Sequence, residues 1–237
     1  MNKKERVQVM KLTYYGHSCF SVEVNDLHLL FDPFITGNPA ASHIDISKIK
    51  ADYILISHGH QDHVLDVEAI AKNTGAKLIS NYEIISWFAD KGLQNGHGMN
   101  LGGEFHFDFG TVKYVNAVHS STMPDGKSGG NAGGFVITPT SSRPSFYYAG
   151  DTALTYDMKL IGETEEIDFA LLPIGDNFTM GAKDAVRCAE MVGTHTIIGL
   201  HYNTFEPIKI DLTKTRQLFD ETGKTLLLPA IGETIEV

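Results

Sequence analysis

The sequence predicts an α/β fold in which two β-sheets pack face to face and helices cover both outer faces, a four-layer αββα sandwich. Three observations predict it. Short apolar strand segments recur on both sides of a midpoint near residue 118. Segments with helical spacing follow several of these strands. No linker, repeat or low-complexity tract divides the 237 residues, so we expect one domain over residues 1–237.

The first third of the chain alternates strands with helices. Residues 12–32 contain two strand segments around an Asn-Asp turn pair, which indicates an antiparallel run. Residues 51–57 form a continuous apolar strand of the kind that is buried on both faces. Helical spacing covers residues 66–73 and 82–90, with a glycine shortly after each and a short strand between them.

The middle of the chain is rich in predicted strands, and the last third alternates again. Residues 123–134 are so rich in glycine that they cannot hold a helix. We interpret them as a loop that becomes ordered near a ligand, although the sequence does not give its role. The predicted strands are 104–110, 111–120, 133–139, 145–151, 167–176, 195–202 and 224–230, and the predicted helices are 184–192 and 212–222.

Composition limits the classes of function. Apolar residues make up 42% and charged residues 20%, an ordinary globular balance. The net charge of −10 argues against a nucleic acid partner, since phosphates bind basic surfaces. No stretch approaches the roughly 20 apolar residues of a membrane span, and the N-terminus lacks an export signal. We therefore expect a cytoplasmic protein with no membrane partner. Cys19 and Cys188 leave open one disulfide or two thiols, and we favour the thiols.

The most informative stretch is ILISHGHQDH, residues 54–63. His58, His60, Asp62 and His63 follow an apolar strand, so they lie on the loop at its C-terminal end, where sites form in layered α/β proteins. Crowded imidazoles and carboxylates are costly unless a divalent metal shares their lone pairs. Helix capping would explain one aspartate and none of the histidines.

Three more ligand-type residues follow apolar strands directly. His119 ends VKYVNAV, Asp151 ends SFYYAG, and His201 ends TIIGL. If the three strands run in the same sense, these side chains reach the same rim of the sandwich as the 54–63 segment. The sequence therefore predicts a metal site assembled from distant parts of the chain.

These motifs resemble a known family. HGHQDH matches the HxHxDH signature of the metallo-β-lactamase superfamily. Together with YYGHSCF, FDPFITGNP, YAGDT, LLPIGDNFTMG and HYNTF, it makes residues 12–230 similar to the uncharacterised metal-dependent hydrolases related to ascorbate-6-phosphate lactonase. The resemblance implies the metallo-β-lactamase fold.

The resemblance also implies two divalent metal ions per chain, for which Zn²⁺, Mn²⁺ and Fe²⁺ all suit the ligands. Asp62 and His201 are expected to act in catalysis, Asp62 by orienting the nucleophile. The implied ligands are His58, His60 and His119 for the first metal, Asp62, His63 and His201 for the second, and Asp151 as the bridge between them.

Five weaker candidates each have a structural alternative. His17 either faces the site or is a buried structural histidine. Asp32 is expected to accept a hydrogen bond from a ligand histidine, or to end a strand as a turn residue. Asp176 and Thr179 lie near the rim or in a plain helix-entry loop, and Asn203 is a candidate substrate contact. The remaining histidines are treated as solvated or structural: His28, His43, His97, His106 and His195.

The leading functional interpretation is a hydrolase in which a hydroxide bridging two metals attacks a small ester-like substrate, a lactone or a phosphorylated sugar derivative. Three alternatives stay open: a phosphodiesterase or RNA-processing nuclease, a diiron oxidoreductase, and a non-catalytic metal-binding protein. The expected partner is a small molecule. The oligomeric state is open from the sequence, and the family resemblance favours a homo-oligomer.

Overall fold

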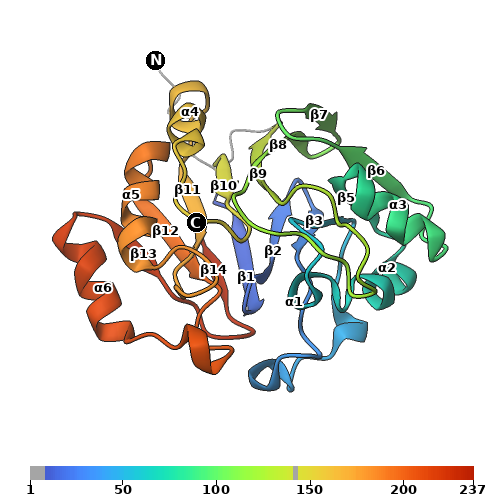
Figure 1. The fold of residues 1–237 in the computed structure, drawn as a ribbon, viewed down its shortest axis with the longest axis horizontal. Coiled ribbons are helices and arrows are strands. Elements are labelled where there is room, and N and C mark those ends of the chain that lie inside the picture. Colours follow the sequence, from blue (N-terminus) through green and yellow to red (C-terminus); the bar gives the residue numbers. More distant parts are fainter. Residues whose placement is uncertain (1–8, 141–143) are drawn as a thin grey trace, which may run out of the picture.

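The computed structural model describes residues 9–140 and 144–237. Two seven-stranded sheets face each other, and helices cover their outer faces (Figure 1). The predicted αββα sandwich is therefore confirmed. Within these described ranges, no helix has the length and apolar character needed to cross a lipid bilayer.

The first sheet combines an antiparallel half with a parallel half. β1 pairs antiparallel with β2, and β2 pairs antiparallel with β3 around the Asn25-Asp26 turn. Both residues of this turn have positive φ, as tight hairpin turns require. β3 to β6 pair parallel. The order is β14 (Thr234–Glu236), β1 (Lys11–Gly16), β2 (Cys19–Val24), β3 (Leu27–Phe31), β4 (Tyr53–Leu55), β5 (Lys77–Asn81) and β6 (Gly96–Met99).

The second sheet supplies the other half of the rim. β9 is antiparallel to β8 and β10, and β10 to β13 are parallel, so β8, β10 and β12 run in the same sense. These are the strands before His119, Asp151 and His201. The order is β13 (Thr225–Leu227), β12 (Thr196–Leu200), β11 (Phe169–Pro173), β10 (Phe146–Tyr148), β9 (Gly133–Pro139), β8 (Gly110–Asn116) and β7 (Glu104–Phe107).

Six α-helices within the described residues form the outer layers. Apolar clusters show that α1 to α3 pack on the first sheet and α4 to α6 on the second. Their bounds are α1 (Gln61–Val64), α2 (Val67–Thr74), α3 (Tyr82–Asp90), α4 (Asp157–Thr164), α5 (Ala182–Val192) and α6 (Leu212–Glu221). Single-turn 3-10 helices are η1 (Pro39–Ala41), η2 (Ile46–Lys48) and η3 (Glu206–Ile208).

The core between the sheets is rich in aromatic side chains. Phe20 stacks on Phe31 with ring centroids 4.4 Å apart, and Tyr148 from the opposite sheet packs edge-on against both. Each fully buried aromatic side chain contributes about 1.5–3 kcal/mol of burial free energy. This packing fixes one sheet against the other, so the strand ends at the rim have defined positions.

Several elements differ from the sequence-based expectation. β4 covers Tyr53–Leu55 rather than 51–57, because the Ser57 N–H donates to the Asp32 side chain instead of a strand. α1, α4, β6 and β14 were not predicted. In α4, Gly162 lowers helix propensity, yet a Cβ there would lie 2.2 Å from the Met191 carbonyl of α5. Gly162 therefore weakens the helical pattern of α4 in the sequence, and it allows α4 to pack closely against α5 in the fold.

Candidate metal centre

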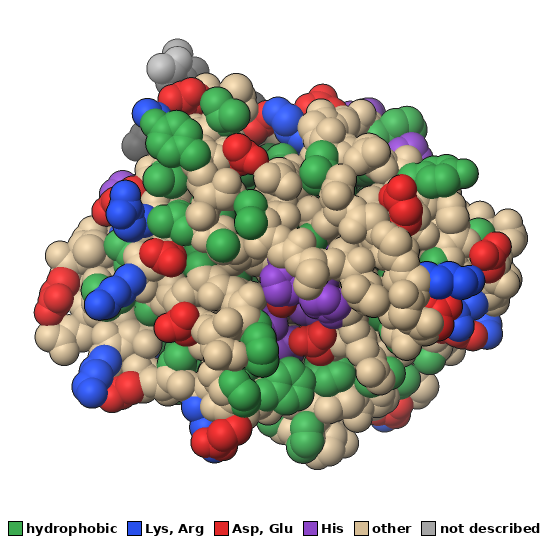
Figure 2. Space-filling model, in the orientation of Figure 1, with side chains coloured by type: hydrophobic (Ala, Val, Ile, Leu, Met, Phe, Trp, Pro, Cys, Tyr) green, Lys and Arg blue, Asp and Glu red, His purple; other side chains and the backbone are tan. Residues whose placement is uncertain are grey.

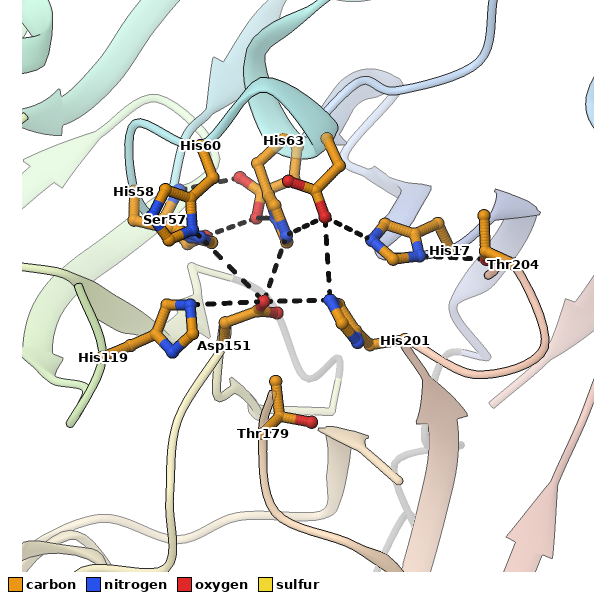
Figure 3. A network of polar contacts seen from close by, with 12 residues as sticks. His17, Ser57, His58, His60, His63, His119, Asp151, Thr179, His201 and Thr204 are labelled. Carbon is orange, nitrogen blue, oxygen red and sulfur yellow. Dashed lines mark hydrogen bonds and ion pairs between the residues drawn. The ribbon is translucent and has the colours of Figure 1, made fainter. Parts of the chain in front are cut away.

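The rim gathers histidines and aspartates from four parts of the chain around one oxygen atom. Asp151 Oδ2 lies 3.0 Å from Nε2 of His201, 3.4 Å from Nε2 of His63, 3.7 Å from Nε2 of His119 and 4.0 Å from Nε2 of His58. Figure 3 shows these side chains pointing toward one another across the gap between the two sheets. The structure therefore brings together all the strand-end residues that the sequence analysis selected.

Two groups of potential ligand atoms flank Asp151. His58, His60 and His119 form the first, with one ring nitrogen of each within 4.8 Å of the others. In the second group, one potential ligand atom of each residue also lies within 4.8 Å of the others. This group comprises His17, Asp62, His63 and His201. These groups match the two ligand sets that the resemblance implies, with His17 as an addition.

Asp32 fixes the histidines from behind. Its Oδ2 accepts from His63 Nδ1 at 2.7 Å and from the Tyr148 hydroxyl at 2.5 Å, and the Ser57 hydroxyl donates to the same oxygen. His58 Nδ1 lies 2.9 Å from Ser57 Oγ. Since the Ser57 proton is directed to Asp32, His58 Nδ1–H is the donor, and its Nε2 lone pair faces the rim.

Ser57 and Tyr148 were not selected from the sequence. Tyr148 stands on β10, and its bond to Asp32 links residues 116 positions apart. Nothing in a one-dimensional pattern distinguishes such a buried tyrosine from an ordinary core residue. Ser57 carried a weak signal, since it ends the strand immediately before the first ligand.

His17 occupies a buried position between the two sheets. Its φ of 55° is left-handed, in the turn between β1 and β2. Nε2 donates to Asp62 Oδ2 at 3.0 Å, and Nδ1 lies 2.9 Å from the Thr204 hydroxyl. Phe34 and Phe205 pack edge-on against the ring. His17 thus faces the cluster, and Thr204 is a partner that sequence reasoning missed.

Burial and neighbouring charges shift the pKa values of the imidazoles in opposite directions. Burial lowers the pKa values of His58, His60 and His119 below the usual 6.5, and it lowers the pKa of His17 to about 4. Burial also opposes charge on His63, but neighbouring carboxylates outweigh it and raise the pKa. The first group is therefore neutral near pH 7, with free lone pairs.

Several donor atoms of the cluster converge on one another, and some of them lack a protein partner. His58 Nε2 lies 3.0 Å from His60 Nδ1, and the hydrogen bond from His58 Nδ1 to Ser57 leaves Nε2 without a proton. His63 Nε2 and Asp151 Oδ1 are buried and have no hydrogen-bond partner among the described residues. Nitrogen and carboxylate donors at these separations suit borderline divalent cations. The residues present therefore fit a metal centre.

The weaker candidates lie in different surroundings. Asp176 is exposed and lines a cavity of about 530 Å³ beside α5 and α6. Asn203 is also exposed, and its Oδ1 accepts from the Ile210 N–H within its own turn. Thr179 lies near Asp151 and His201 (Figure 3), while its hydroxyl donates to the Met180 carbonyl. A site role stays a prediction for all three.

The glycine-rich segment 123–134 is held by side chains of α3 and its N-cap residue. Asn81 donates to the carbonyls of Gly129 and Asn131 at 2.6 and 2.9 Å. Trp87 donates to Asp125 at 2.8 Å. The segment is therefore a wall beside the metal loop, and its ordering by a ligand stays a prediction.

Comparisons with known proteins agree with this geometry. A family described as "Beta-lactamase superfamily domain" matches residues 11–201. A UPF0173 metal-dependent hydrolase of Flavobacterium johnsoniae is 54% identical over 228 residues, covering 96% of this chain and 100% of the relative. Another, from Christiangramia forsetii, is 52% identical over 229 residues, with 96% and 100% covered.

A solved structure gives the same result. Igni18, a metallo hydrolase from the hyperthermophilic archaeon Ignicoccus hospitalis, matches with a TM-score of 0.88 at 34% identity, covering 97% of this chain and 99% of that chain. The narrower resemblance to ascorbate-6-phosphate lactonase stays a prediction. The chain belongs to the metallo-β-lactamase superfamily and, within it, to the UPF0173 metal-dependent hydrolase family.

Proposed function

We propose that this protein is a metal-dependent hydrolase that cleaves an ester-like bond of a small molecule. One observation carries the proposal. A single carboxylate oxygen of Asp151 lies within 3.0–4.0 Å of four imidazole nitrogens contributed by both sheets. Such convergence is costly without a metal, because it buries ionisable groups together and leaves polar atoms of His63, Asp151 and His201 without partners. The names of the relatives, metal-dependent hydrolases, support the same class of reaction.

Seven side chains are proposed to hold two divalent ions. Bound there, the ions would supply Lewis acidity and would lower the pKa of a coordinated water molecule toward neutrality. Zn²⁺, Mn²⁺ and Fe²⁺ remain the candidates. The proposed ligands are His58, His60 and His119 for one ion, Asp62, His63 and His201 for the other, and Asp151 between them.

The protein's own groups then orient the reactants. Asp62 keeps 28% of its side chain exposed, so its carboxylate reaches both the cluster and an incoming substrate. His17, whose Nδ1 contacts the Thr204 hydroxyl, holds that carboxylate in one orientation. We propose that Asp62 accepts the proton of the attacking water, and that His201, 3.0 Å from Asp151, holds the bridging carboxylate in place.

The proposed substrate is a lactone or related ester. A phosphorylated sugar derivative and a phosphodiester contain comparable electrophilic centres, so they belong in any substrate screen. Cytoplasmic location and a homo-oligomeric state are part of the same proposal.

Metal analysis coupled to an activity screen tests the proposal. Protein purified without chelator should contain about two divalent ions per chain and hydrolyse esters or lactones. Asp151→Asn should lower both metal content and kcat/KM by at least about tenfold. His106→Ala, which alters an exposed histidine on β7, should change neither. Protein with restored metals that cleaves no ester, lactone or phosphodiester would contradict the hydrolase proposal.

A further inference from the structure

We propose that the substrate of this site is uncharged and carries an apolar acyl or alkyl group, so that it is an alkyl-substituted ester or lactone and not a phosphorylated compound. The inference rests on the proposed hydrolase function and narrows its substrate class. Two independent features of the site carry it: the absence of cationic side chains from the loops of the rim, and a collar of exposed apolar side chains around the metal ligands.

The loops that carry the metal ligands and their direct hydrogen-bond partners contain no lysine or arginine. Recognition of a phosphate monoester normally uses such side chains, because charge-assisted hydrogen bonds hold the dianion. Here the loops offer the exposed carboxylates Asp176 and Glu206 instead, which repel an anion. The loops are residues 16–18, 32–38, 57–66, 117–123, 149–156, 174–181 and 201–206.

Cationic side chains begin just outside these loops: Lys183 follows residues 174–181 and is exposed, whereas Lys127 and Lys209 are paired with carboxylates. Lys127 lies 3.8 Å from Asp125, and Lys209 forms an ion pair with Glu206. Figure 2 shows the histidines at the base of a hollow near the middle of this face, while the lysine and arginine side chains lie toward its periphery. A phosphorylated substrate would therefore meet no cationic side chain within the loops that carry the ligands.

Exposed apolar side chains adjoin the loops that carry the ligands. Four of the large hydrophobic residues left in solvent directly adjoin ligand loops: Leu65 is 37% exposed, Val118 49%, Phe178 54% and Phe205 36%. Leu65 follows α1, Val118 precedes His119, and Phe178 precedes Thr179. Apolar groups that gather around a polar site are typical of a binding surface for an apolar ligand.

One side of this collar is a continuous aromatic wall. Phe205 and Phe34 both pack against the His17 ring, with centroids 5.4 and 5.5 Å away, and they lie 6.2 Å from each other. Phe34 and Leu65 both approach Gly37, where an added Cβ would lie 2.3 and 2.7 Å from their side chains. An acyl chain leaving the metal centre would thus meet aromatic and aliphatic surface.

A chain-length series tests the inference. With metal-loaded protein, kcat/KM for para-nitrophenyl acetate, butyrate, hexanoate and octanoate should rise about two- to fourfold per added methylene, until the chain outgrows the collar. Lactones with lengthening alkyl substituents should follow the same trend. A lactone carrying a phosphomonoester should be hydrolysed at least about tenfold less efficiently than its unphosphorylated counterpart.

Binding measured without turnover separates recognition from chemistry. Calorimetry with γ-lactams, whose amide resists cleavage, should show tighter binding as the alkyl substituent lengthens, and no gain from a phosphate group. Phe178→Ala and Phe205→Ala should each flatten the dependence on chain length. Phe105→Ala, which removes a comparably exposed phenylalanine from β7, is the matched control and should leave both measurements unchanged.

The outcomes separate this inference from the hydrolase proposal. Hydrolysis of acetate and octanoate esters with equal efficiency, or preference for the phosphorylated lactone, would overturn the inference while leaving the hydrolase in place. A chain-length trend that Phe105→Ala flattens as much as Phe178→Ala would overturn the assigned collar. If metal-loaded protein hydrolysed none of these substrates, the proposed function itself would be overturned.

Discussion

His63 differs from the other histidines of the cluster because its surroundings favour the charged ring. Burial opposes that charge, yet Asp151, Asp62 and Asp32 together raise the pKa. At His58, burial dominates and lowers the pKa. In the metal-free protein near pH 7, the ligand group that contains His63 therefore holds a proton that a metal must displace. The group that contains His58 presents free lone pairs.

This difference predicts unequal loss of the two metals on acidification. Binding at the His63 group releases a proton, so its affinity should fall about tenfold per pH unit below the raised pKa. The lowered pKa values of His58, His60 and His119 keep protons from competing until the pH falls well below 6.5. Equilibrium dialysis from about pH 8 to about pH 5 should show stepwise loss. A single midpoint for both metals would contradict this assignment.

Asp32 is predicted to matter as much as a ligand although it lies behind the cluster. Asp32→Asn removes the charge that orients His63 and Ser57, while asparagine tolerates the φ of 39° at this position. We expect metal affinity to fall about 10–100-fold and the free energy of unfolding to fall by about 2–4 kcal/mol. Metal titration and thermal unfolding measure the two effects.

The control for this substitution is Asp52→Asn. Asp52 is an exposed aspartate next to β4 that also accepts a backbone N–H, from His28. It lies outside the cluster, so metal affinity should not change. Wild-type affinity in Asp32→Asn would show that His63 is positioned by something other than this carboxylate.

At the scale of elements, side-chain hydrogen bonds connect the loops around the site to helices elsewhere in the sequence. Asn81 accepts from the Ile84 N–H as the cap of α3 and also donates to the glycine-rich segment 123–134. That segment lies against the metal loop, since a Cβ at Gly59 would come within 2.5 Å of Met123 Sδ. One side chain thus joins the start of a helix to a wall of the site.

Replacing this amide should loosen the wall and spare the helix. Asn81→Asp keeps the capping oxygen but turns the donor toward two carbonyls into an acceptor, which should cost about 1–3 kcal/mol. Asn81→Ala should cost about 1 kcal/mol more through loss of the cap. In hydrogen exchange, the amides of residues 129–133 should lose protection in both variants, and those of α3 only in the second.

A surface amide provides the control for these variants. Asn95 donates to the Gly75 carbonyl at an exposed site, and Asn95→Asp should leave exchange in the glycine-rich segment unchanged. Full protection of that segment in Asn81→Asp would mean that its other contacts, which include Trp87, Tyr114 and Ser121, hold it without Asn81.

Across the whole molecule, the sequence predicted the layers and the rim but not the contacts behind it. Strand-end positions for His119, Asp151 and His201 follow from local apolar runs, and closure of the sandwich brings those ends together. The bond from Tyr148 to Asp32 and the pairing of His17 with Thr204 join distant parts of the chain. Such partners depend on tertiary proximity, which apolar periodicity does not encode.

The charge of the whole chain argues against phosphodiester substrates and predicts how salt should act. A net charge of −10 and a rim without cations repel anions over a Debye length of about 10 Å at 0.1 M salt. For bis(para-nitrophenyl) phosphate, kcat/KM should therefore rise several-fold between about 0.01 and 0.15 M salt, because screening weakens the repulsion. For a neutral ester it should stay constant, and RNA should show no retardation in a gel. A phosphodiester rate that falls with salt would instead indicate an attractive basic surface and favour the nuclease alternative.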